Sequence, residues 1–122
     1  MNRRLTLALL AGTGLFLPIP GQAQLNPFRS SWRAGLSNED FRLMNQAAEQ
    51  LRNKTNVPDG TSTEWSNTRS GASGTITIDS TFHSRGMLCR KMDYSATRPD
   101  GRAPATATLN WCKTPQGWKI LS

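Results

Sequence analysis

Two cysteines and one histidine are the side chains of this sequence best suited to chemistry. Cys89 and Cys112 are too far apart to form the Cys-x-x-Cys motif of a redox-active pair. A metal site needs three or four converging ligands, and with His83 as the only histidine no convincing set can be assembled. We therefore predict one structural disulfide between Cys89 and Cys112, no metal site and no cofactor.

The remaining nucleophiles and acids do not predict a catalytic site. His83 could activate a serine, but the sequence has no Gly-x-Ser-x-Gly motif, and the Ser- and Gly-rich stretch 70–74 predicts a turn. Glu64, Asp79 and Asp93 fall in expected strands, where two carboxylates could pair as in glycosidases. Solvent-exposed strand residues explain these acids better. We predict no catalytic residues and a protein that is not an enzyme; the alternative is a small-ligand or hydrolytic pocket between the helix and the sheet, whose catalytic version would depend on His83.

The first 23 residues have the pattern of a cleavable signal peptide. Arg3 and Arg4 precede an apolar run over residues 5–17, and a Gly-Gln-Ala sequence ends at Ala23. The run is shorter than the about 20 residues of a membrane span. An uncleaved signal anchor is the alternative, but Pro18 and Pro20 would break its helix.

Cleavage after Ala23 divides the sequence into three parts. Residues 1–23 are the expected signal peptide, 24–36 a leader segment and 37–122 the folded domain. We expect a periplasmic or cell-envelope location, which is an oxidising compartment that suits the disulfide. No cysteine stands near the cleavage site, so no lipid anchor is expected, and no later stretch predicts a transmembrane span. Whether Arg3-Arg4 marks twin-arginine export or an ordinary positive start is left open.

The formal net charge of +7 excludes little by itself, because the basic residues are scattered along the sequence. No run of them resembles a nucleic-acid-binding arm, so nucleic acid is not an expected partner. An exported basic protein would meet an anionic envelope polymer or an envelope protein. The alternative is that the charge serves solubility alone.

A helix is predicted from Ser37 to about Asn53. Ser37 can cap the helix, and Asp40 can complete a capping box, though glutamate is the usual partner. A buried stripe is expected from the 3.6-residue period of Phe41, Met44, Ala48 and Leu51. Arg52 is expected to face away from that stripe.

After Thr61 the apolar period changes to two, which predicts an antiparallel sheet. Ile76, Ile78 and Phe82 are expected on one face of the second strand. Strands are expected at residues 63–65, 75–82, 87–97, 103–113 and 118–121. The predicted fold is therefore α+β, with one N-terminal helix packed on a four- to five-stranded antiparallel meander.

The third and fourth strands predict their own register. Their apolar faces are Leu88, Met92 and Tyr94 on one strand and Ala107, Leu109 and Trp111 on the other. A two-residue turn centred on Asp100-Gly101 brings these faces together and places Cys89 directly opposite Cys112. A type I turn at Pro99-Asp100 with a bulge would split the faces, so we prefer the first register.

The same register places Arg90 opposite Trp111 on the helix-facing side. We expect a cation–π contact between them. The alternative is that Arg90 is a ligand-binding arginine at the edge of the sheet.

An ordered set of short motifs resembles the C-terminal domain of the rickettsial-type surface antigen family. These motifs are Trp65-Ser66-Asn67, Ser70-Gly71-Ala72-Ser73-Gly74-Thr75-Ile76, Gly86, Cys89-Arg90, Trp111-Cys112-Lys113 and Gly117-Trp118-Lys119-Ile120. The resemblance covers residues 46–120 and lacks the lipobox cysteine and glycine-zipper segment of the family's layout. It implies a cystatin-like fold and an outer-membrane or envelope protein without an assigned enzymatic role.

Together, these features predict a non-catalytic envelope protein with a binding or structural role. Its candidate binding or structural residues are Arg90, Trp111, Trp118 and Trp65. The alternative is a cystatin-like inhibitor or assembly factor for an envelope enzyme, which would use the loops near Asp100-Gly101 and His83.

Overall fold

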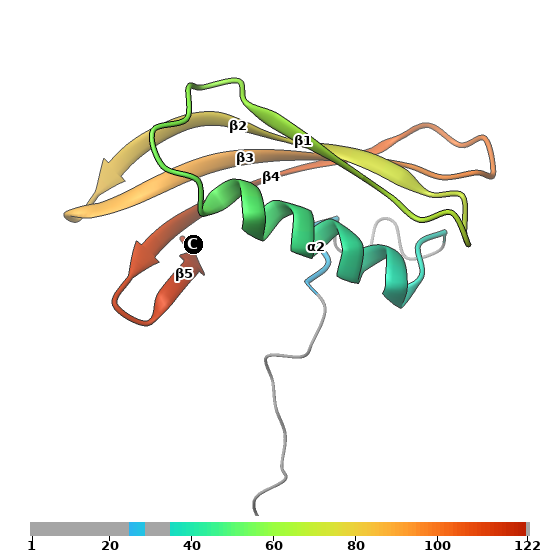
Figure 1. Ribbon diagram of the computed structural model, residues 1–122, viewed down its shortest axis with the longest axis horizontal. Coiled ribbons are helices and arrows are strands. Elements are labelled where there is room, and N and C mark those ends of the chain that lie inside the picture. The colour runs from blue at the N-terminus through green and yellow to red at the C-terminus, as the bar shows by residue number, and fades with distance from the viewer. Residues whose placement is uncertain (1–24, 29–34, 122) are drawn as a thin grey trace, which may run out of the picture.

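One helix and five strands make up the part of the chain that the computed structural model describes, residues 25–28 and 35–121 (Figure 1). Their bounds are α2 (Asn38–Arg52), β1 (Ser62–Ser66), β2 (Ser73–Ser84), β3 (Met87–Thr97), β4 (Ala105–Thr114) and β5 (Gly117–Ile120). The predicted signal peptide and much of the predicted leader lie outside these ranges, so both stay predictions.

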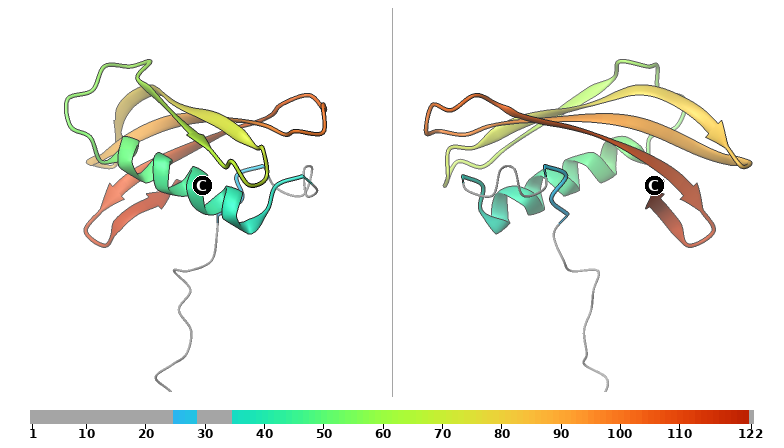
Figure 2. Two further views of the ribbon diagram at one scale, coloured as in Figure 1. Left: turned by 45° about the vertical axis from the view of Figure 1, so that its right-hand side comes forward. Right: turned by 180° about the vertical axis from the view of Figure 1, so that it is seen from behind.

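The strands form one antiparallel sheet in the order β1-β2-β3-β4-β5. The sheet is curled, and α2 lies across its concave side (Figures 1 and 2). The β4–β5 hairpin bends toward the carboxyl end of α2 (Figures 1 and 2). This arrangement confirms the predicted α+β class, the N-terminal helix and the antiparallel meander, while the likeness to cystatins stays a prediction.

The predicted register of β3 and β4 is confirmed, but the predicted two-residue turn is wrong. Cys89 pairs with Cys112 and Met92 with Leu109, as expected. The ladder ends at the pair Ala96–Ala105, so the connection is a longer loop. The next pair would need Pro104, which has no N–H to donate to a ladder, and Pro99 lies further into the loop.

A bulge in β2 changes which residues face the helix. The register between β2 and β3 shifts between Ile78 and Ser80. Before the shift, Ile78 lies opposite Met92 on the helix side; after it, Phe82 lies opposite Cys89. The prediction that Phe82 shares a face with Ile78 is therefore wrong, because the extra residue reverses the alternation.

The disulfide between Cys89 and Cys112 links directly opposed residues of β3 and β4. The two Cα atoms are 4.0 Å apart. Both cysteines are buried, on the face of the sheet that points away from the helix. The bulge brings Phe82 to this same face.

The core lies between α2 and the concave side of the sheet. Met44, Ala48 and Leu51 are buried along the helix, as predicted. Arg52 is also buried, contrary to the prediction that it faces away. Phe28 of the leader packs into the same cluster. The cluster is completed by Ala72 of the β1–β2 turn and by the buried strand residues Trp65, Ile76, Ile78, Met92, Tyr94 and Ala96.

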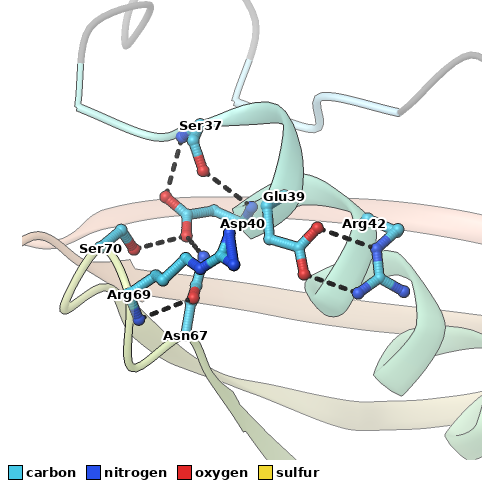
Figure 3. Close-up of polar contacts among 7 residues, drawn as sticks. All are labelled: Ser37, Glu39, Asp40, Arg42, Asn67, Arg69 and Ser70. Atoms are coloured by element: carbon cyan, nitrogen blue, oxygen red, sulfur yellow. Dashed lines mark hydrogen bonds and ion pairs between the residues drawn. The ribbon is translucent and has the colours of Figure 1, made fainter.

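The amino end of α2 is held by the buried carboxylate of Asp40 (Figure 3). Ser37 forms the predicted capping box with it: Ser37 Oγ accepts from Asp40 N, and Asp40 Oδ2 accepts from Ser37 N at 2.8 Å. Asp40 Oδ1 accepts from Asn67 Nδ2 at 2.7 Å and from Ser70 Oγ at 2.6 Å. The carboxylate therefore ties the helix to the β1–β2 turn.

The hydrogen bonds to Asp40 determine its charge state. Burial raises the pKa of Asp40, but hydrogen bonds from Ser70, Ser37 and Asn67 outweigh this effect and leave the pKa below its ordinary value. A carboxylate with a lowered pKa adds stability above the pKa of the unfolded chain, and that contribution is lost as the pH falls through the folded-state pKa.

We expect Asp40→Asn to lower the free energy of unfolding by about 2 kcal/mol at neutral pH, because the amide has one acceptor oxygen and its nitrogen would face either Ser37 N–H or the donors of Asn67 and Ser70. Urea denaturation at several pH values measures this. The gap between wild type and variant should shrink below about pH 4, where the carboxylate of the unfolded wild-type chain begins to protonate, and close further as the pH falls through the lower pKa of the folded chain. A gap independent of pH would contradict a charged Asp40.

A second prediction concerns Gly74, which lies opposite Trp65 in the β1–β2 ladder. A Cβ atom there would overlap the carbonyl oxygen of Ser95 and come within 2.6 Å of Trp65 Nε1. We expect Gly74→Ala to lower the free energy of unfolding by about 1–3 kcal/mol, measured by urea denaturation. Ser73→Ala is the matched control and should change it little; equal effects of the two would refute the steric explanation.

Candidate functional site

A groove of about 330 Å³ opens at the carboxyl end of α2. Its walls come from the end of α2, the loop that follows, and the neighbouring ends of β2, β3, β4 and β5. Figures 1 and 2 show that the β4–β5 hairpin curls toward this end of the helix. We call it the cationic groove, defined by Arg52, Lys54, Thr81, Arg90, Lys113 and Trp118.

Arg90 forms the buried wall of the cationic groove and is 4% exposed. Its Nη1 donates to the carbonyl oxygen of Arg52 at 2.8 Å and to that of Lys54 at 2.7 Å. These carbonyls end the helix, where the last backbone acceptors lack intrahelical partners and the dipole favours a cation. Arg90 therefore fixes the carboxyl end of α2, while its Nε has no hydrogen-bond partner.

The cation–π contact on Trp111 comes from Arg52, not from Arg90 as predicted. The Arg52 guanidinium carbon lies 3.9 Å from the centre of the Trp111 ring. The prediction was wrong because the helix places Arg52 over β4, while Arg90 turns toward the helix carbonyls. Trp111 Nε1 donates to the Tyr94 hydroxyl at 3.0 Å.

Trp118 forms the outer wall of the cationic groove. It is half-buried, and its Nε1 donates to Asn53 Oδ1 at 2.9 Å. Trp118 lies opposite Lys113 in the β4–β5 hairpin, so both side chains share one face. The indole of Trp118 is thereby held beside the flexible ammonium of Lys113.

The cationic groove holds four basic side chains and no acidic one among its described lining residues. The ion pairs of the described chain involve other basic residues: Arg42, Lys91, Arg98 and Arg102. Burial lowers the pKa of Arg90, and burial lowers that of Arg52 against the opposing effects of Tyr94 and Glu49. Both guanidinium groups stay charged at neutral pH because their ordinary pKa is far higher. No ion pair among the described residues neutralises the positive charge of the groove.

Trp65, the fourth predicted candidate, lies away from the cationic groove. It is buried in the core and packs against Gly74 near the β1–β2 turn. A shallow, polar depression of about 460 Å³ lies beside it, lined mainly by serine and threonine of β1, β2 and β3. The structure thus brings Arg90 and Trp118 to the groove and places Trp111 beside it under Arg52, but separates Trp65 from them.

The side chains that line the cationic groove can bind an anion. His83 is exposed in β2, not in the predicted turn, and does not line the groove. No cluster of three possible metal ligands occurs within residues 25–28 and 35–121. The described groove residues offer guanidinium, ammonium, amide and hydroxyl donors around an indole ring, which suits an anion with an attached ring or chain.

Four of the residues that define the groove, Arg52, Lys54, Thr81 and Lys113, were not predicted as candidates from the sequence. Arg52 was expected at the surface, while Thr81 and Lys113 carried no signal of function. The bulge in β2 turns Thr81 to the groove side, opposite Arg90. The sequence does offer one signal for Arg52: a basic residue in the last turn of a helix interacts favourably with the helix dipole.

Comparison with known proteins identifies relatives. The model of the family described as 17 kDa outer membrane surface antigen matches residues 54–119. The 17 kDa surface antigen of Rickettsia felis is 33% identical over 90 residues, which is 72% of this chain and 54% of that protein. The chain therefore spans about half the length of this relative. No solved structure matches this chain significantly.

The family match covers most of the cationic groove. Lys54, Thr81, Arg90, Lys113 and Trp118 all lie within the matched residues. Within the described residues, no helix has both the length and the apolar character needed to cross a membrane.

We expect Arg90→Lys to lower the free energy of unfolding by about 2 kcal/mol, because an ammonium on a flexible chain is not held within reach of both carbonyls as the rigid guanidinium holds Nη1. Urea denaturation of the purified protein measures this loss. Arg85→Lys, at the exposed β2–β3 turn, is the matched control. If both variants unfold at the same urea concentration as wild type, Arg90 does not anchor the helix.

Proposed function

Because this chain belongs to the 17 kDa outer membrane surface antigen family, we propose that it is an exported protein of the bacterial cell envelope that acts by binding. In this proposal the signal peptide is removed after Ala23 and the mature protein works in the periplasm or at the envelope. Its partner is an envelope protein or an anionic envelope polymer. The observation that carries the proposal is the family match, which associates the chain with the envelope.

Two features of the chain support this location. The sequence begins with the pattern of a signal peptide. The buried disulfide needs an oxidising compartment such as the periplasm to form and persist. Both point away from the reducing cytoplasm.

A non-catalytic role fits the chemistry of the cationic groove. Its described lining offers donors and positive charge but no histidine, cysteine or carboxylate. A groove of this composition holds an anion and lacks the general base that most hydrolytic mechanisms require. Binding is therefore the role that its residues support best.

The alternative role of a cystatin-like inhibitor gains no support from the arrangement of the loops. In an antiparallel meander, the β2–β3 turn near His83 and the β3–β4 loop at Asp100-Gly101 lie at opposite ends of the sheet (Figure 1). A single wedge cannot use both loops. We therefore favour binding through the cationic groove.

Cell fractionation and intact mass test the proposal. We expect the native protein in the periplasmic or envelope fraction, with a mass that begins at Gln24. Without reductant its mass should be lower by about 2 Da, the two hydrogens lost when the disulfide forms. An unprocessed protein with two free thiols in the cytoplasm would refute the proposed function.

A further inference from the structure

The unpaired charge of the cationic groove indicates what kind of group it binds. Arg90 is almost fully buried, yet no carboxylate of the described chain forms an ion pair with it. Its Nε, Arg52 Nε and Thr81 Oγ1 are buried and lack hydrogen-bond partners. A buried guanidinium without a counter-charge is costly, so an anion in the groove would recover part of that cost. Binding of an anionic ligand in the groove would therefore lower the electrostatic cost of burying Arg90.

The fixed position of Arg90 makes this charge selective. Its two hydrogen bonds to the helix carbonyls hold the guanidinium in one place. Lys54 and Lys113 are exposed at the rim and can move toward an incoming anion. A rigid buried cation with flexible cations around it favours a single acidic group over a continuous surface of charge.

The outer wall of the groove indicates what carries the acidic group. Trp118 presents a half-buried indole whose N–H is already bonded to Asn53. Thr55 and Asn56 add hydroxyl and amide groups to the lining. A sugar ring needs this combination, because its C–H face packs on an aromatic ring while its hydroxyls need polar partners.

The size of the groove and its four basic side chains argue against an acyl chain. Its volume of about 330 Å³ is at the small end for ligand sites. Val57, Leu88 and Trp118 are the apolar residues of an otherwise polar and charged lining. A lipid tail would bury polar groups here without hydrogen bonds, which is unfavourable.

We propose that the cationic groove binds an acidic sugar unit of an envelope polymer, with its acidic group directed at Arg90 and Lys113 and its ring against Trp118. This inference rests on the proposed function, since it assumes that the protein meets envelope polymers. The acid can be a carboxylate or a phosphate, because both bind guanidinium and ammonium groups in the same way.

Titration of the oxidised protein, purified from the periplasm and followed by amide and indole N–H resonances in NMR, tests the proposal. Glucuronic acid and glucose 6-phosphate are the charged probes, and glucose is the neutral one. We expect a dissociation constant on the order of 1 mM for one or both charged sugars, with shifts at the Trp118 indole. Glucose should bind at least about tenfold more weakly. The tighter charged probe identifies the acid as carboxylate or phosphate.

A matched pair of variants locates the binding. Lys113 lies on the groove side of the β4–β5 hairpin, whereas Lys119 is paired with Cys112 and lies on the other face. Both are exposed, so Lys113→Gln and Lys119→Gln remove the same charge with little effect on folding. Lys113→Gln should weaken binding about tenfold, while Lys119→Gln should leave it nearly unchanged.

Several results would overturn the proposal. If glucose bound as tightly as the charged sugars, the charge would have no part in recognition. If acetate or inorganic phosphate bound as tightly as the charged sugars, the sugar ring would have no part in it. Equal losses in Lys113→Gln and Lys119→Gln would indicate general attraction by net charge. Binding to phosphatidylglycerol vesicles in place of the sugars would indicate a lipid surface. These titrations are separate from fractionation: a failed titration leaves an envelope location intact, and a cytoplasmic location would refute the proposed function itself.

Discussion

Two buried charges of opposite sign hold α2 against the sheet. Asp40 at the amino end binds the β1–β2 turn through Asn67 and Ser70, and Arg90 of β3 binds the carbonyls at the carboxyl end. Each sign matches the helix dipole at its end. Because both groups are buried, removing their partners would leave a charge in a region of low dielectric constant. The apolar stripe makes α2 pack on the sheet, and the charges of Asp40 and Arg90 fix the position of the helix along the sheet.

The cationic groove is a consequence of this arrangement. Fixing the end of α2 beside β3 brings Arg52 over Trp111 and leaves space between the helix end and the β4–β5 hairpin. Arg90 therefore has two roles, since one nitrogen binds the helix while the rest of its charge faces the groove. Stability and binding are coupled at this residue, whereas Lys113 at the rim contributes charge without holding the fold.

Helix capping and the alternation of strand faces predicted the parts of the fold that depend on residues close together in the sequence. The capping box at Ser37 and the opposition of Cys89 to Cys112 follow from neighbouring residues and from alternating faces. The bulge in β2 was not predictable in this way, because it depends on how β2 fits the curl of the whole sheet. The position of Arg52 was missed for a related reason: a residue at the edge of the apolar stripe becomes buried only when β4 supplies Trp111. The groove itself joins five elements, so no single stretch of sequence reveals it.

The disulfide joins two strands that are neighbours both in the sheet and along the chain. The residues between Cys89 and Cys112 form one hairpin, and the sequence contains no third cysteine that could pair wrongly. Oxidation therefore requires only that this hairpin forms, and it does not depend on prior docking of the helix. If the chain is exported as proposed, a thiol oxidase is sufficient to close the bond, and a disulfide isomerase has no mispaired bond within this sequence to correct.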